Sequence, residues 1–443
     1  MIYGIARFLV RLALGVFFRK IEVEGKENVP HQGPVLIAAN HTNALVDPLV
    51  IATQLRRPIT VTAKSTLTQN PLLALLFRIF HVVPFYRRED PGVDPARNLG
   101  SLEECRQRLA RGAAICIFPE GQSHSDPHLR PFRTGVGRIV QAWFETPGSA
   151  PLTVVPVGHV FQDNGRLRSA VWVRFGPPMD AAQWRTEHPD AGPRELTEEI
   201  EERVRRLTLN FRRERYSVLL GWAADVVATR AAPPPALGRE SMTLADRVRL
   251  VQRLNAGYED LEKKRPVEIA ALVDRVRRYV FEVHRIGISP AEVYLPMGPS
   301  RAAFFILREF ELIIIGLPLA LWGAMNHMLP YWMVRLAERR LTRARDQRAS
   351  SIIFTSLLLF PLFYAAQIAT AWMMLSPLWA TIYTISLPYS GYFAALYGER
   401  VGGILQRSRT FLRFLFRPKL QEHLMDEGRG ILDEIVRLGR EVA

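Results

Sequence analysis

Residues 34–48 read PVLIAANHTNALVDP, an apolar run that ends at a histidine and is followed six positions later by an aspartate. A run rich in Val, Leu, Ile and Ala is typical of a buried strand. Further short apolar runs follow at ITVTAK (59–64), AAICIFPE (113–120), LTVVPVG (152–158) and VWVRFG (171–176), with helical stretches between them. This alternation predicts an α/β domain in which a central β-sheet is flanked by helices.

His41 and Asp47 stand at the two ends of the turn that follows the first run. Six residues along an ideal helix correspond to roughly 240° of rotation, so a turn must bring Asp47 back beneath His41. Asn43 and Pro48 suit such a turn. A carboxylate held against one ring nitrogen fixes the tautomer of a histidine and makes it a better general base. The two residues are therefore a candidate base and its orienting acid, although such a pair taken alone is more often structural.

The remainder of the chain predicts a second, helical region. A length of 443 residues exceeds that of a typical single domain, and the prolines of AAPPPALG (231–238) interrupt any continuous helix. Beyond them, apolar residues recur at the spacing of packing helices. We expect an interfacial amphipathic helix at 1–20, the α/β domain at 21–215, a helical linker region at 216–300, membrane-embedded helices at 301–398 and a basic cytosolic tail at 399–443.

Two apolar stretches predict a C-terminal α-helical membrane region. Residues 352–397 are almost wholly apolar, about twice the roughly 20 residues of one spanning helix, so we expect a hairpin broken near Ser376. The stretch 311–334 contains Gly316, Pro318 and Pro330, which leaves a re-entrant or broken hairpin and a simple span both open. Arginines flank each stretch, so the positive-inside rule predicts an integral membrane protein whose α/β domain lies on the cytosolic face.

The charge balance and the N-terminus point to the membrane as well. A formal net charge of +15 favours an anionic partner, and arginines placed beside apolar segments favour anionic membrane lipids over nucleic acid. Arginines interrupt the apolar residues of segment 1–20, which predicts an in-plane helix and not a cleaved signal peptide; a helix packed on the domain is the alternative. The two cysteines, Cys105 and Cys116, support neither a disulfide framework nor a cysteine-based zinc site.

Four further sequence blocks follow the His41 turn in a fixed order: TAKSTL (62–67), VVPFYRRED (82–90), CIFPEGQSHS (116–125) and VVPVG (154–158). Together they resemble the phospholipid and glycerol acyltransferase family over residues 20–215. The resemblance implies an enzyme that moves a fatty acyl group from a thioester donor, acyl-CoA or acyl-ACP, to a glycerol-phosphate acceptor without a cofactor. The sequence leaves the oligomeric state open.

The resemblance also implies roles for individual residues. His41 would take the proton of the acceptor hydroxyl, and Asp47 would orient the imidazole. Arg87 would bind the acceptor phosphate, and Glu120 with Gly121 would form part of the acceptor site.

A phosphate-bearing acceptor needs cationic donors near the base, and guanidinium groups match phosphate oxygens well. The candidate substrate-binding cations are Lys64, Arg87, Arg88 and Arg133. The segment HSDPH (124–128) is a poor match to zinc-ligand spacings, so we predict no metal site.

The chain departs from the family pattern at two positions. Five residues separate His41 from Asp47 where most members have four, and FPEGQSHS replaces FPEGTRS, so that Ser123 stands where an arginine is usual. These departures are similar to the fungal-type glycerol-3-phosphate and dihydroxyacetone-phosphate acyltransferase subgroup, which favours glycerol 3-phosphate as the acceptor. Acylation of 1-acylglycerol 3-phosphate is the first alternative. A catalytically inactive membrane scaffold with the same fold is the second.

Overall fold

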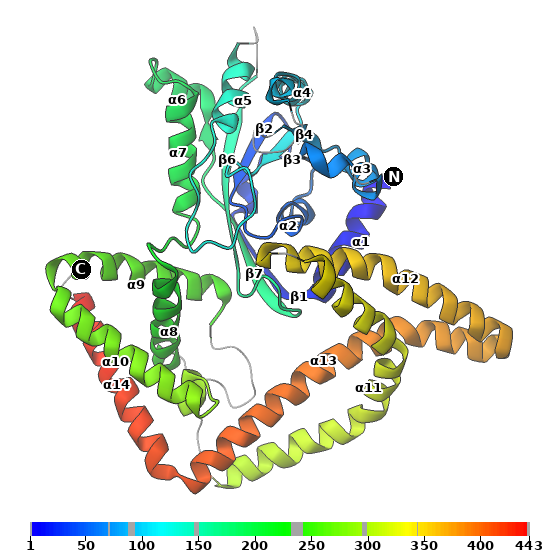
Figure 1. The fold of residues 1–443 in the computed structure, drawn as a ribbon, viewed down its shortest axis with the longest axis vertical. Coiled ribbons are helices and arrows are strands. Elements are labelled where there is room, and N and C mark those ends of the chain that lie inside the picture. Colours follow the sequence, from blue (N-terminus) through cyan, green and yellow to red (C-terminus); the bar gives the residue numbers. More distant parts are fainter. Residues whose placement is uncertain are drawn as a thin grey trace. The chain divides into compact units, whose positions relative to one another are not determined.

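The computed structural model describes residues 2–69, 71–86, 94–145, 150–231, 242–294, 299–342 and 344–440. The chain divides into two compact units. The first comprises Met1–Asn210 together with Glu338–Phe354, and the second comprises Phe211–Ala337 together with Thr355–Ala443. The first unit contains the β-sheet, and the second contains most of the long apolar helices (Figure 1).

In the described part of the first unit, eight strands form a sheet in the order β1-β7-β6-β2-β5-β3-β4, with β8 paired to β6. The strands are β1 Phe18–Glu24, β2 Val35–Ala39, β3 Ile59–Lys64, β4 Val83–Phe85, β5 Ala114–Ile117, β6 Thr153–Phe161, β7 Ser169–Phe175 and β8 Met179–Asp180. All neighbours are parallel except that β7 and β8 run antiparallel to β6. The five apolar runs became β2, β3, β5, β6 and β7, which confirms the predicted central sheet.

Strand β2 is the centre of the sheet. All five of its residues are buried, as expected for a strand covered on both faces. Ile37 pairs with Cys116 of β5 on one side and with Val155 of β6 on the other. Because β2, β5 and β6 are parallel, their carboxyl ends meet at one edge of the sheet, where open α/β sheets bind their ligands.

Helices cover both faces of this sheet. Those of the first unit are α1 Ile2–Phe17, α2 Val46–Gln54, α3 Pro71–Ile79, α4 Asn98–Ala110, α5 Gly135–Phe144, α6 Ala181–Glu187 and α7 Pro193–Arg205. Leu109, Ile139 and Ile200, from α4, α5 and α7, pack in one buried cluster against the sheet. Helix α1 buries Leu14 while its Phe8 remains exposed, so the predicted amphipathic helix packs on the domain by one face and leaves an apolar face outside.

The second unit has its own helical core. Its helices are α8 Glu214–Ala231, α9 Leu244–Lys264, α10 Pro266–Arg285, α13 Pro377–Phe416 and α14 Pro418–Arg440, with most of α11 Pro299–Leu341 and α12 Arg348–Met374. Val280 of α10 and Ile431 of α14 are fully buried in a cluster that also includes residues of α8, α9 and α13. Arg275 pairs with Glu427 and Glu434 across the same two helices. Elements far apart in the sequence therefore share one core.

Helix α11 decides between the two conformations that the sequence left open for residues 311–334. No broken or re-entrant hairpin forms over residues 311–334, because α11 is continuous and contains Pro318 and Pro330 within it. A proline removes one hydrogen bond and bends a helix, but neighbouring helices can compensate for this loss. Figure 1 shows that α11 bends along its length. The break near Ser376 is found, since α12 ends at Met374 and α13 begins at Pro377.

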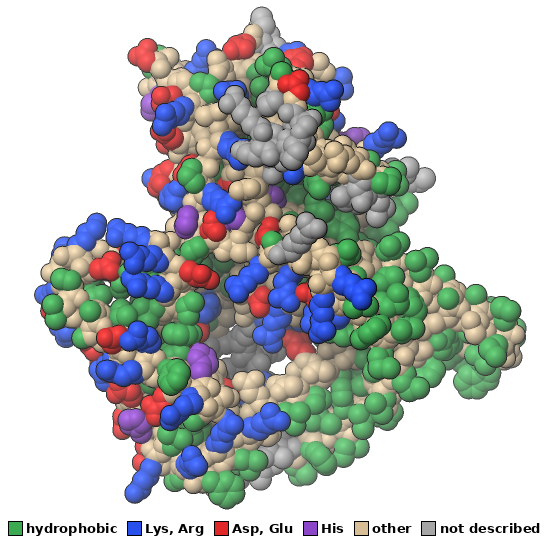
Figure 2. Space-filling model, in the orientation of Figure 1, with side chains coloured by type: hydrophobic (Ala, Val, Ile, Leu, Met, Phe, Trp, Pro, Cys, Tyr) green, Lys and Arg blue, Asp and Glu red, His purple; other side chains and the backbone are tan. Residues whose placement is uncertain are grey.

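Among the described helices, two segments are long and apolar enough to cross a membrane, Ile313–Leu341 and Arg345–Met374. Large apolar side chains on α12 and α13, among them Met373 and Trp379, are more than half exposed. Figure 2 shows hydrophobic side chains gathered over these helices. An exposed apolar surface of this kind suits contact with lipid.

Candidate active site

The turn after β2 places Asp47 beneath His41. Asp47 lies in the first turn of α2, and its Oδ2 accepts hydrogen bonds from the backbone N–H groups of Thr42 and Asn43, both at 2.8 Å. The same oxygen lies 2.9 Å from Nδ1 of His41. Within the spacer between the two residues, Ala44 has a φ of +31°, which is rare for a residue with a side chain. The turn thus wraps around one carboxylate oxygen.

This contact fixes the tautomer of His41. An ionised carboxylate can only accept, so Nδ1 carries the proton and Nε2 keeps its lone pair. The ring stacks on Phe118, with 4.4 Å between centroids, and the side chain is 15% exposed. His41 is therefore held from two sides and remains reachable at the nitrogen that a general base uses.

Asp47 remains ionised in spite of complete burial. Burial alone would raise the pKa of its carboxyl group, but His159 and, to a smaller extent, His41 lower that pKa well below its usual range. His159 Nε2 lies 3.1 Å from Asp47 Oδ1, a separation of ion-pair length whose alignment falls short of a hydrogen bond. Asn40 holds His159 in place through reciprocal hydrogen bonds with the His159 backbone, at 2.9 and 3.1 Å.

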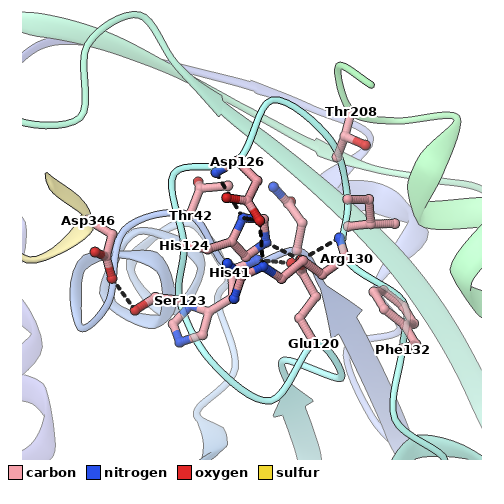
Figure 3. A network of polar contacts seen from close by, with 12 residues as sticks. His41, Thr42, Glu120, Ser123, His124, Asp126, Arg130, Phe132, Thr208 and Asp346 are labelled. Carbon is pink, nitrogen blue, oxygen red and sulfur yellow. Dashed lines mark hydrogen bonds and ion pairs between the residues drawn. The ribbon is translucent and has the colours of Figure 1, made fainter. Parts of the chain in front are cut away.

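Glu120 connects the loop after β5 to His41. Its Oε1 accepts from the backbone N–H of His41 at 2.6 Å, and its Oε2 accepts from that of Arg130 at 2.9 Å. Oε2 also contacts Nε2 of His124, as Figure 3 shows. Glu120 is 3% exposed, so three donors converge on one buried carboxylate. Its position sets that of the His41 backbone.

His124 extends this network outward. Its Nδ1 accepts the backbone N–H of Asp126 at 3.1 Å, so its proton resides on Nε2, which donates to Glu120. Asp126 in turn accepts from Arg130 Nε at 2.6 Å, and this hydrogen bond lowers the pKa of the Asp126 carboxyl group. Among the described residues, no group of three or more His, Cys, Asp or Glu side chains could hold a metal ion.

The structure describes two of the four predicted cations, Lys64 and Arg133. Lys64 is the last residue of β3 and therefore lies at the same sheet edge as His41. Arg133 packs over Gly121, where an added Cβ would come within 2.6 Å of its Nε. Gly121 itself has a φ of +80°, which glycine adopts without strain. Arg87 and Arg88 lie outside the described residues.

The opposite edge of the sheet holds a separate cavity. It has a volume of about 750 Å³ and is lined by basic residues that include Arg57 and Arg108. It also includes Gly33 and Ala113, which precede β2 and β5. Arg57 there donates to the carbonyl oxygens of Pro30 and Gly33. The cavity lies at the amino end of β2, whereas His41 follows the carboxyl end, so the cavity is not part of the His41 site.

Two histidines of the network, His159 and His124, are not among the site residues predicted from the sequence. His159 lies within β6, which the VVPVG block had located as a strand, and the parallel pairing of β6 with β2 brings it to Asp47. His124 was considered only as a metal ligand, yet it lies four residues after Glu120 and contacts that carboxylate. The available signal for His159 was its position directly after VVPVG, in the same run of strand-forming residues.

The acyltransferase family model matches residues 20–160. An uncharacterized acyltransferase of Schizosaccharomyces pombe is 23% identical, over 79% of this chain and 64% of the relative. Glycerol-3-phosphate O-acyltransferase 1 of Saccharomyces cerevisiae is 24% identical, over 40% of this chain and 35% of the relative. The 1-acyl-sn-glycerol-3-phosphate acyltransferase of Borreliella burgdorferi is 27% identical, over 39% of this chain and 67% of the relative.

Among solved structures, the 1-acyl-sn-glycerophosphate acyltransferase PlsC of Thermotoga maritima aligns with a TM-score of 0.36 and 23% identity, over 46% of this chain and 77% of that chain. The matched segment of the family model contains His41, Asp47 and Glu120. The match to the acyltransferase family is therefore carried by residues 20–160, and the chain spans less than two thirds of the first two curated relatives.

Proposed function

We propose that this chain is an O-acyltransferase that transfers a fatty acyl group from acyl-CoA or acyl-ACP to glycerol 3-phosphate, without a cofactor. The observation that carries the proposal is the pair formed by His41 and Asp47, in which a buried carboxylate leaves Nε2 of the imidazole free to accept a proton. The family of the domain supports the reaction class. The likeness to the Saccharomyces cerevisiae relative supports the acceptor.

The chemistry requires one base and no covalent enzyme intermediate. Nε2 of His41 removes the proton of the acceptor hydroxyl as its oxygen attacks the thioester carbonyl carbon. The tetrahedral oxyanion collapses, the carbon–sulfur bond breaks, and the thiolate leaves. The imidazolium, stabilised by Asp47, then returns its proton to that thiolate. Atoms and charges balance with an ester and a free thiol as products.

The acceptor phosphate would be bound by cations at the same edge of the sheet. Lys64 and Arg133 are the described candidates. Arg87 is a candidate by family resemblance, and Arg88 is a candidate as a further cation in the same sequence block. A charged hydrogen bond to phosphate is worth about 1.5–3 kcal/mol. Each cation should therefore affect acceptor affinity more than donor affinity.

A second acceptor is favoured by a separate observation. Several relatives are named as 1-acyl-sn-glycerol-3-phosphate acyltransferases, including those of Borreliella burgdorferi and Mycoplasma pneumoniae, at 27% and 30% identity. The same base and cations would serve this acceptor, which differs by one acyl chain. Acylation of 1-acylglycerol 3-phosphate is therefore the alternative function.

The proposed location is a membrane with the acyltransferase domain on the cytosolic face. Helices α10 and α14 share one buried core although α11, α12 and α13 lie between them in the sequence. A core cannot form across a bilayer, so these three helices must make an even number of crossings. We propose a hairpin in which α12 and α13 cross the membrane and α11 does not, which satisfies this condition and keeps the arginine-rich flanks on the cytosolic side.

In the direct test, the purified full-length chain is incubated with a labelled acyl donor, acyl-CoA or acyl-ACP, and with one of three acceptors: glycerol 3-phosphate, dihydroxyacetone phosphate or 1-acylglycerol 3-phosphate. The proposal expects the highest kcat/KM with glycerol 3-phosphate. Preference for 1-acylglycerol 3-phosphate would establish the alternative function. No transfer by folded protein to any acceptor would favour an inactive scaffold.

A further inference from the structure

A segment far along the chain returns to the acyltransferase domain. Residues Glu338–Phe354 join α11 to α12 and belong to the first unit, not to the second. Within them, Asp346, Ala349 and Ser350 are at most 6% exposed. Buried polar side chains such as those of Asp346 and Ser350 form hydrogen bonds within the protein.

Ser350 contacts the turn between His41 and Asp47. Its Oγ accepts the backbone N–H of Leu45 at 3.1 Å. Leu45 follows Ala44, the residue with the left-handed φ of +31°, and such a conformation persists only where its surroundings hold it. Ser350 therefore supports the strained part of the turn that presents His41 to its substrate.

Asp346 contacts the loop that carries Glu120. Its Oδ2 accepts from Oγ of Ser123, and Figure 3 shows the pair beside the Glu120 network. Ser123 directly precedes His124, which contacts Glu120. Asp346 is thus connected to the His41 backbone through Ser123, the adjacent His124 and Glu120.

Arg348 contacts a third loop. Its side chain passes within 3.1 Å of the position that a Cβ on Gly165 would occupy. The neighbouring Asn164 donates to the carbonyl of Thr42 at 2.8 Å and accepts from the Asn43 side chain at 3.2 Å. One segment, residues 346–350, consequently touches the three loops that surround His41.

We infer that Asp346 and Ser350 are positioning residues of the active site, which hold the His41 turn and the Glu120 loop in their working geometry. The inference rests on the proposed function. It also gives a physical reason for both departures from the family pattern. The longer spacer contains the N–H that Ser350 satisfies, and Ser123, in place of arginine, is the residue that Asp346 binds.

The first test measures kinetics of full-length variants in lipid nanodiscs. Ser350→Ala should lower kcat about tenfold or more, because displacement of a catalytic group by 1 Å can cost about 100-fold. The KM for acyl-CoA should stay within about twofold, and Ser350→Thr, which keeps the acceptor oxygen, should restore most of the rate. Ser351→Ala is the matched control on the next position of α12. Equal losses in the Ser350→Ala and Ser351→Ala variants would overturn the inference.

The second test asks whether Asp346 acts through Ser123. If it does, Asp346→Ala and Ser123→Ala should each lower kcat. The kcat of the double variant should then lie within about twofold of that of the less active single variant, since the effects of coupled sites are not additive. Losses that multiply would overturn this part of the inference.

The third test does not depend on activity. Amide hydrogen exchange at Leu45 should accelerate about tenfold or more in Ser350→Ala, which removes its acceptor, and stay slow in Ser350→Thr and Ser351→Ala. Unchanged exchange in Ser350→Ala would overturn the inference. If wild-type protein transferred no acyl group, this measurement would still decide the contact, so failure of the proposed function is distinguished from failure of the inference.

Discussion

Substitution of Glu120 by glutamine should damage the site more than the loss of one charge suggests. Three donors point at its two oxygens: the N–H groups of His41 and Arg130 and Nε2 of His124. A glutamine offers one oxygen, and its amide nitrogen is itself a donor. Whichever way the amide is turned, at least one donor faces another donor.

The network offers no alternative arrangement that avoids this conflict. If the amide nitrogen takes the position of Oε1, it faces the N–H of His41. If it takes the position of Oε2, it faces the N–H of Arg130, and moving the proton of His124 to Nδ1 would set that group against the N–H of Asp126 at 3.1 Å. One buried unsatisfied donor costs about 1–3 kcal/mol. Because the His41 backbone shifts with the loop, kcat/KM should fall about 10- to 100-fold.

The assay combines thermal unfolding of the purified full-length chain with acyl transfer from acyl-CoA. For a unit of this size, about 1–3 kcal/mol corresponds to a fall in Tm of several degrees. Glu145→Gln, on an exposed residue at the end of α5, makes the same chemical change and should alter neither quantity. A Glu120→Gln variant with wild-type Tm and kcat/KM would refute the role of Glu120 as the acceptor of these three donors.

Three further predictions concern charge, backbone and topology. The pKa of Asp47 is lower in the folded protein than in the unfolded chain, where it is about 3.9, so the ionised carboxylate stabilises the fold at higher pH. The difference in unfolding free energy between wild type and Asp47→Asn should therefore be constant above about pH 5 and shrink as the pH falls below about 4. A difference independent of pH would contradict this. Gly121→Ala places a Cβ 2.6 Å from Arg133 Nε at a φ of +80°, so it should raise the KM for the acceptor and lower Tm by several degrees, and unchanged values of both would contradict the packing. In sealed vesicles of cytosol-inside orientation, a cysteine at exposed Ser376 should react with an external probe while one at exposed Gln347 should not; external labelling of both would contradict a hairpin of α12 and α13.

The sheet could be predicted because its strands are buried on both faces, which makes each a continuous apolar run such as Val35–Ala39. The contact between His41 and Asp47 was also accessible, since both residues belong to one short turn and the constraint is local. The C-terminal apolar helices followed from length and hydropathy. The continuity of α11 did not, because Pro318 and Pro330 disfavour a helix locally while packing and neighbouring helices decide the outcome.

Long-range contacts account for what the sequence could not indicate. His159 reaches Asp47 only because β6 pairs beside β2, an order that no local pattern encodes. Ser123 and Asp346 are 223 positions apart, and the second lies in a segment that composition assigns to the membrane region. Neither residue carries a local signal for the other. The sequence therefore indicates the base and its acid, and the fold supplies the groups that hold them.

The central claim is that His41 is the general base of acyl transfer, and one comparison tests it most directly. Purified His41→Ala and its control His31→Ala, which changes an exposed histidine, are compared with wild type for transfer from acyl-CoA to glycerol 3-phosphate at saturating substrate. General-base catalysis contributes about 10²–10⁴-fold, so the His41 variant should retain less than about a hundredth of the wild-type kcat, while its Tm stays close to that of the control. A folded His41→Ala protein that kept more than about a tenth of the wild-type kcat would contradict the assignment of His41 as the base.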